Sequence, residues 1–118
     1  MSYDINLLDP VTKEVIEFDF PHQIKGGTYV VGGTNRAWLN VTYNYSKFYY
    51  NVFGDKGIRT IYGMTGAESI PVLKEAISKL GDDTHPDYWK PTEGNAKESL
   101  LGLLAFAQMR PDGIWYGD

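Results

Sequence analysis

Four side chains that could bind a ligand alternate along one short stretch of the chain. Trp38, Asn40, Thr42 and Asn44 occupy every second position, so an extended backbone would place them on one face. An indole beside two amides and a hydroxyl offers stacking area and neutral hydrogen-bonding groups. This combination indicates ligand recognition rather than acid–base catalysis. We expect Trp38 and Asn40 to be reached from solvent through a cleft, because burial would require a partner for every donor and acceptor in the row.

Other residues of the same kind lie elsewhere in the chain. Tyr88 and Trp89 stand in a polar loop flanked by prolines, and Thr92 and Asn95 mark a predicted helix start whose free amides could receive a polar ligand. Arg36 could supply a guanidinium fork for phosphate. The predicted ligand-binding site therefore consists of Arg36, Trp38, Asn40, Thr42, Asn44, Tyr88, Trp89, Thr92 and Asn95.

Two other features could hold an anion or a ligand, and each also has a structural interpretation. The helix starts near Thr65 and Thr92 offer amides beside Arg36 or Arg59, but Glu93 could satisfy one of these ends by itself. The paired glycines at positions 26–27 and 32–33 allow close approach to a ligand and are equally typical of plain turns.

A metal site is not expected. The loop that holds Asp82, Asp83, His85 and Asp87 lacks the spacing and the glycine of a calcium loop. His22 is the other histidine, and no zinc-type histidine spacing occurs. The chain has no cysteine, which excludes thiolate ligands, a thiol nucleophile and disulfides. We therefore predict no metal and no cofactor.

No catalytic residues are predicted either. No serine or threonine lies in a glycine-flanked elbow beside a base. The carboxylates Glu14, Glu17 and Asp19 are best explained as the solvent face of a hairpin rather than an acid–base pair. An enzyme is the least favoured of the functional classes considered.

Composition narrows the class of partner. The 118 residues carry a formal net charge of −4, which disfavours duplex nucleic acid because phosphate contacts need positive charge. No apolar run is long enough to span a membrane, and the first residues lack the pattern of a secretory signal. We expect a cytoplasmic protein that binds a small molecule or a host protein, either as a monomer or as a homo-oligomer.

Alternating apolar residues predict strands in the first half of the chain. Residues 3–7 and 16–20 alternate apolar and polar side chains, and a turn at residues 9–12 would join them into a hairpin. Residues 36–45 would form the central strand of the sheet. A further short strand is expected near residues 29–31, between the two pairs of glycines.

Helical spacing dominates the second half. A short helix is expected between residues 46 and 54, and the last helix follows Thr92. The helix between them is predicted to begin near Thr65, where Glu68 suits a capping box, although Ser69 could cap it instead.

These elements predict one α+β domain over residues 1–118. Its antiparallel sheet has three to four strands from the N-terminal half, and the short helix and two longer C-terminal helices pack on one face. The aromatic tail at residues 113–118 should pack on the body or on a partner.

Five motifs spread over most of the chain are Gly-Gly-Thr-Tyr at 26–29, Trp-Leu-Asn-Val-Thr-Tyr-Asn-Tyr at 38–45, Gly-Met-Thr-Gly-Ala-Glu-Ser-Ile-Pro at 63–71, Asp-Tyr-Trp at 87–89 and Thr-Glu-Gly-Asn-Ala-Lys at 92–97. Together they resemble a family of small bacterial and phage proteins to which no activity is assigned. The resemblance implies a similar architecture and a phage or bacterial setting.

We therefore predict a non-catalytic binding protein, encoded by a phage or prophage, that sequesters a small planar polar ligand resembling a nucleotide. A role against host defence fits such a protein. The alternative is a protein–protein inhibitor or adaptor that acts on a host protein through an acidic, aromatic-rich surface, which would include Tyr49, Tyr50, Trp115 and Tyr116.

Overall fold

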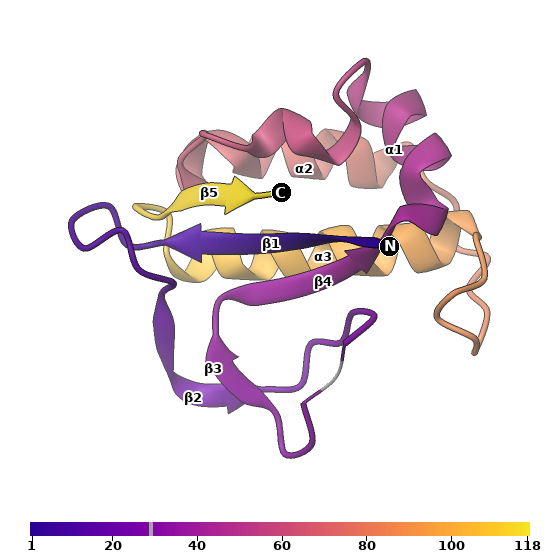
Figure 1. Ribbon diagram of the computed structural model, residues 1–118. Helices are drawn as coiled ribbons and strands as arrows, with labels where there is room; N and C mark the ends of the chain where they lie inside the picture. Colours follow the sequence, from indigo (N-terminus) through magenta and orange to yellow (C-terminus); the bar gives the residue numbers. More distant parts are fainter. Residues whose placement is uncertain (29) are drawn as a thin grey trace.

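The computed structural model, which describes residues 1–28 and 30–118, has the predicted α+β architecture. Three antiparallel strands form the main sheet in the order β4–β1–β5 (Figure 1), with bounds Ser2–Leu8 for β1, Trp38–Thr42 for β4 and Ile114–Gly117 for β5. A second sheet pairs two strands, Glu17–His22 (β2) and Thr34–Arg36 (β3).

The helices cover one side of the main sheet. In Figure 1 α3 lies behind β1 and β4, α2 lies above it in the view beside β5, and the short helix α1 follows β4. Their bounds are Ser46–Phe53 for α1, Gly66–Ser78 for α2 and Glu93–Met109 for α3. Among the residues described, no helix combines the length and the apolar character needed to cross a membrane.

The core lies between the main sheet and these helices. Alternation along β1 turns Tyr3, Ile5 and Leu7 toward the helices, and all three side chains are buried. Burying a large apolar side chain stabilises a protein by about 1.5–3 kcal/mol. The large buried side chains that complete this core are Leu39, Tyr45, Tyr49, Ile58, Ile61, Leu73, Leu100, Leu103, Phe106 and Trp115.

The prediction of residues 36–45 as the central strand is wrong. The central strand is β1, which pairs with β4 on one side and β5 on the other. Only Trp38–Thr42 is extended in β4, because the Thr42 side chain accepts a hydrogen bond from the Asn44 amide and starts a 3-10 helix, η1, over Tyr43–Tyr45. The alternation therefore predicted a strand correctly but not its position in the sheet.

The predicted first hairpin forms its turn but not its strand pair. Both edges of β1 are occupied by β4 and β5, so β2 leaves β1 after a single bridge between Leu8 and Val15 and pairs with β3 instead. The short strand expected near residues 29–31 is not formed at Val30 and Val31, and its first residue lies outside the described residues.

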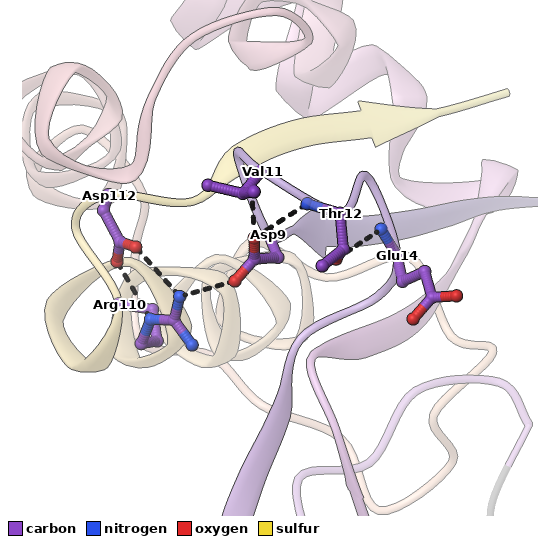
Figure 2. A network of polar contacts seen from close by, with 6 residues as sticks. All are labelled: Asp9, Val11, Thr12, Glu14, Arg110 and Asp112. Atoms are coloured by element: carbon purple, nitrogen blue, oxygen red, sulfur yellow. Dashed lines mark hydrogen bonds and ion pairs between the residues drawn. The ribbon is translucent and has the colours of Figure 1, made fainter.

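Figure 2 shows the turn after β1 and its tie to the end of α3. The carboxylate of Asp9 accepts hydrogen bonds from the Val11 amide at 2.8 Å and the Thr12 amide at 3.1 Å. Its second oxygen accepts one from Arg110 at 3.2 Å, and Arg110 also pairs with Asp112. The Thr12 and Val11 amides, followed by the Arg110 guanidinium, lower the pKa of Asp9.

The starts of the two longer helices are capped as the sequence predicts. Thr65 and Glu68 form a capping box at α2, with bonds of 2.9 and 3.1 Å between side chain and backbone. Thr92 caps α3 by accepting a hydrogen bond from the Asn95 amide. Gly54 ends α1 with a φ of 101°, which favours glycine. Residues Gly57–Ile61 form a 3-10 helix, η2.

Candidate functional site

Side chains on the uncovered face of the main sheet form a row across all three strands. Asn6 on β1 stands directly opposite Trp38 on β4 and Tyr116 on β5. Directly opposed residues point to the same face of a sheet, and neighbouring strands lie about 4.8 Å apart. The row therefore presents an indole and a phenol ring about 10 Å apart, with an amide between them.

Two shallow grooves lie along this row. One of about 520 Å³ is lined by Asn6, Arg36 and Trp38, and another of about 710 Å³ is lined by Asn6, Arg36 and Tyr116. Asn6 and Arg36 line both grooves, so the two grooves are neighbours. Tyr116 is 62% exposed, and Trp38 is half-buried. We call Asn6, Arg36, Trp38 and Tyr116 the open row.

A carboxylate orients the indole of the open row. The Trp38 Nε1 donates to Asp4 Oδ1 at 3.3 Å, and the Asn40 amide donates to the same oxygen at 3.0 Å. Asn40 also donates to the Ser2 hydroxyl at 2.7 Å. The Asp4 backbone amide in turn donates to Asp118. Trp38 is therefore held in place while its ring borders the groove.

The expectation that Asn40 is open to solvent is wrong, because its side chain is only 6% exposed. A segment of the chain itself lies over it. The Gly27 amide donates to the Asn40 carbonyl at 2.9 Å. A Cβ atom on Gly26 would lie 1.7 Å from that carbonyl oxygen, and one on Gly27 would lie 2.6 Å from the Asn40 side chain and 2.8 Å from the Trp89 ring. The first glycine pair therefore approaches β4 rather than a ligand.

Tyr88 covers the edge of β4 next to these glycines. Its hydroxyl accepts a hydrogen bond from the Thr42 amide at 3.0 Å and donates to the Asn40 carbonyl at 3.2 Å. Burial raises the pKa of Tyr88, so the phenol stays neutral and can do both. An edge strand otherwise leaves such backbone groups unpaired. Thr42 is itself buried.

The rest of the predicted polar row also makes contacts within the protein. The Asn44 side-chain amide donates to the Trp89 carbonyl at 2.9 Å. The Tyr45 hydroxyl donates to the Tyr88 carbonyl, and burial raises the pKa of Tyr45. Trp89 remains 48% exposed, with its ring edge-on to that of Tyr88. These bonds attach the loop before α3 to β4 and η1.

Asn95 fixes the same loop from the first turn of α3. It is 5% exposed, accepts a hydrogen bond from the His85 amide at 2.9 Å, and donates to the carbonyls of Asp87 at 3.0 Å and Lys90 at 3.2 Å. The polar residues of β4 and the segments that cover them form what we call the closed network. Its members are Gly26, Gly27, Asn40, Thr42, Asn44, Tyr88, Trp89, Thr92 and Asn95. The structure thus places seven of the nine predicted site residues in the closed network, and Arg36 and Trp38 in the open row.

The alternative sites proposed from the sequence are occupied by the protein's own groups. Arg59 donates to the Asp118 carbonyl and the Tyr43 hydroxyl. At the start of α3, the Glu93 carboxylate accepts a hydrogen bond from the Gly81 amide. Lys97, one turn further along the helix, forms an ion pair with Asp82. Across residues 1–28 and 30–118, no group of three or more His, Asp and Glu side chains could hold a metal ion.

The sequence did not indicate Asn6, and it indicated Tyr116 only as part of the aromatic surface and not as part of the ligand site. The buried positions of β1 imply that Asn6 faces outward, but its partners were unknown. Tyr116 follows the buried Trp115 on a strand of four residues, which is too short to show alternation. The predicted aromatic surface also needs correction, because Tyr49 and Trp115 are buried, whereas Tyr50 and Tyr116 are exposed.

Comparison with known protein families, with curated protein sequences and with solved structures found no match. The resemblance to small bacterial and phage proteins therefore stays an expectation drawn from the motifs.

Proposed function

We propose that the protein binds a small, planar, polar ligand resembling a nucleotide on the open row, without chemical conversion of the ligand. The observation that carries the proposal is the row itself, in which Trp38 and Tyr116 flank Asn6 across the sheet. Aromatic rings bind flat ring systems by stacking. Each of the two grooves beside them has a volume within the range of known small-molecule sites, roughly 300–1,000 Å³.

Each side chain of the open row has a distinct role in this proposal. Trp38 and Tyr116 stack against the ring of the ligand, and the Asn6 amide offers one donor and one acceptor to the ring edge. Arg36 binds a phosphate group through its guanidinium fork. Within the described part of the chain, the Arg36 guanidinium forms no ion pair, so it is available to an anion.

The surroundings of the row fit binding better than catalysis. Asp4, Glu14 and Glu17 are the carboxylates that line the two grooves, and Asp4 already accepts hydrogen bonds from Trp38 and Asn40. Neither histidine belongs to the open row, since His22 contacts Phe106 and His85 lies in the loop before α3. A cytoplasmic location and a phage or prophage origin remain part of the proposal.

The proposal is tested by titrating the protein with adenosine, AMP and ribose 5-phosphate in isothermal titration calorimetry. We expect AMP to bind more tightly than either fragment, because stacking and phosphate contacts combine. Tyr116→Ala and Trp38→Ala should each weaken AMP binding about tenfold, which corresponds to roughly 1.4 kcal/mol. Arg36→Gln should weaken AMP binding but leave adenosine binding unchanged.

Tyr50→Ala is the matched control, because Tyr50 is another exposed tyrosine, on α1 and away from the sheet. It should bind AMP like the unmodified protein. Equal losses for Tyr50→Ala and Tyr116→Ala would assign the binding to non-specific aromatic contacts. Native mass spectrometry with a mixture of nucleosides and nucleotides that yields no complex would disprove the proposal.

A further inference from the structure

Another groove lies between β2 and the end of α3, and it shares Glu17 with the groove beside Tyr116. Its volume is about 510 Å³. The apolar side chains that line it are Phe18, Phe20, Pro21 and Met109. Phe20 is 78% exposed and Met109 is 51% exposed. Large apolar side chains gathered in one exposed groove are typical of an interaction surface rather than of scattered surface residues.

The floor of the groove is rigid. The Phe18 ring packs on the buried Phe106 ring with centroids 5.6 Å apart, and the His22 ring lies 5.0 Å from the same ring. His22 also bonds to the Arg36 carbonyl at 2.6 Å. The strand that carries Phe20 is therefore anchored, so its backbone needs little additional ordering when a partner binds.

Charge selects the kind of partner. Glu17 and Asp19 line the groove and are exposed. Among the residues described, neither forms an ion pair. Arg110, the basic residue of the groove, is already paired with Asp9 and Asp112. The groove is therefore apolar with an acidic rim, and complementary charge on a partner would be basic.

A second copy of this chain fits the groove poorly. A symmetric contact through β2 would bring Glu17 and Asp19 of one copy against those of the other, and like charges in an interface are unfavourable. In the part of the chain that the structure describes, β2 pairs only with β3. Its other edge therefore has backbone groups that a segment of another protein could pair with.

We propose that this groove is a docking site for a segment of another protein in which apolar side chains are flanked by lysine or arginine. The apolar side chains contact Phe20 and Met109, and the basic side chains pair with Glu17 and Asp19. This interaction uses a different groove from the open row and goes beyond the binding of a small ligand. It gives the protein a means of contacting a larger partner.

The test uses two fluorescein-labelled peptides in fluorescence anisotropy, Lys-Lys-Leu-Phe-Val-Lys-Lys and Glu-Glu-Leu-Phe-Val-Glu-Glu. We expect the basic peptide to bind at least about tenfold more tightly than the acidic one. Phe20→Ser and Asp19→Lys should each weaken binding of the basic peptide about tenfold, as loss of an interface anchor does. Both residues are exposed, so circular dichroism should show an intact fold.

Two matched variants separate the groove from general surface properties. Val31→Ser removes an apolar side chain that is 91% exposed, and Asp55→Lys makes the same charge change after α1. Both should bind the basic peptide within about twofold of the unmodified protein. Equal losses for Asp55→Lys and Asp19→Lys, or full binding by Phe20→Ser, would overturn the proposal. So would a dimer in analytical ultracentrifugation that Phe20→Ser abolishes.

Discussion

The closed network and the open row contain the same kinds of side chain and share one face of β4, yet they differ in what covers them. Asn40 and Thr42 lie beneath Gly26, Gly27 and the loop of Tyr88, whereas Trp38 borders an open groove. Each amide of the closed network has a partner within the protein. A polar row on a strand is therefore a binding surface only along the part that no other segment covers.

The difference also shows two uses of an aromatic residue. The Tyr88 hydroxyl bonds to backbone groups of β4 and replaces the neighbouring strand that the edge lacks. Tyr116 makes no such bond among the described residues and is mostly exposed. The first tyrosine contributes to stability and the second is available for recognition. Mutations should distinguish these two uses.

Among the variants of the closed network, the largest effect is expected for Gly26→Ala. The new Cβ atom would lie 1.7 Å from the Asn40 carbonyl oxygen, so the segment would have to leave the edge of β4. We expect a loss of about 3 kcal/mol in the free energy of unfolding, at the upper end of overpacking costs. Urea denaturation measures it. Gly81→Ala is the control, because its Cβ would lie at an ordinary 3.5 Å from its nearest neighbour.

A smaller loss of stability should follow from Asn40→Ala. The substitution removes the donor to Asp4 and Ser2 from a buried position. Leaving such groups without partners costs about 1–3 kcal/mol, which reverses the expectation for an open cleft. Thermal unfolding measures the change, and Asn51→Ala at an exposed site should stay within about 0.5 kcal/mol. An unchanged melting temperature for Asn40→Ala would show that the hydrogen bonds of the Asn40 side chain do not stabilise the fold.

Tyr116→Ala should leave stability nearly unchanged, within about 0.5 kcal/mol, because the side chain is mostly exposed. The neighbouring Trp115→Ala should cost about 3–5 kcal/mol, since this indole is buried and donates to Ser69. Urea denaturation of both variants compares the two faces of β5 directly. Similar losses for both would place Tyr116 in the core and remove it from the open row.

The smallest effect concerns the turn after β1, which lies outside both regions. The pKa of Asp9 is lowered in the folded protein by the Thr12 and Val11 amides and by Arg110. A lowered carboxyl pKa stabilises the fold above the unfolded value of about 4, and this contribution is lost as the pH falls below it. Asp9→Asn should therefore show a weaker loss of stability between pH 5 and pH 3 in urea denaturation. A loss identical to that of the unmodified protein would remove Asp9 as a cause.

The helices could be predicted from the sequence because their signals are local. Thr65 and Glu68 form the capping box that their spacing predicts, and Thr92 caps α3. Strand pairing could not be predicted in the same way. β1 is paired with β5, more than a hundred residues away along the chain, and no local pattern specifies such a partner.

The candidate site was predicted only in part for the same reason. Alternation correctly placed Trp38, Asn40 and Thr42 on one face. The alternation could not show that other segments cover β4. The covering residues, Gly26 and Tyr88, lie at distant positions in the sequence. Tyr116 became recognisable only through its pairing with Asn6, which brings the tail beside β1.

The pairing of β1 with β5 has a kinetic consequence. Asp4 bonds to Asp118 across a separation of 114 residues, and Asn6 meets Tyr116 nearby. Contacts of such high sequence separation form slowly, because closing a long loop costs entropy before the contact stabilises the chain. The open row is assembled from both ends of the chain, so it cannot exist in a partly folded intermediate that lacks β5. Recovery of ligand binding after dilution from urea should therefore follow the slowest refolding phase, later than the recovery of helical signal.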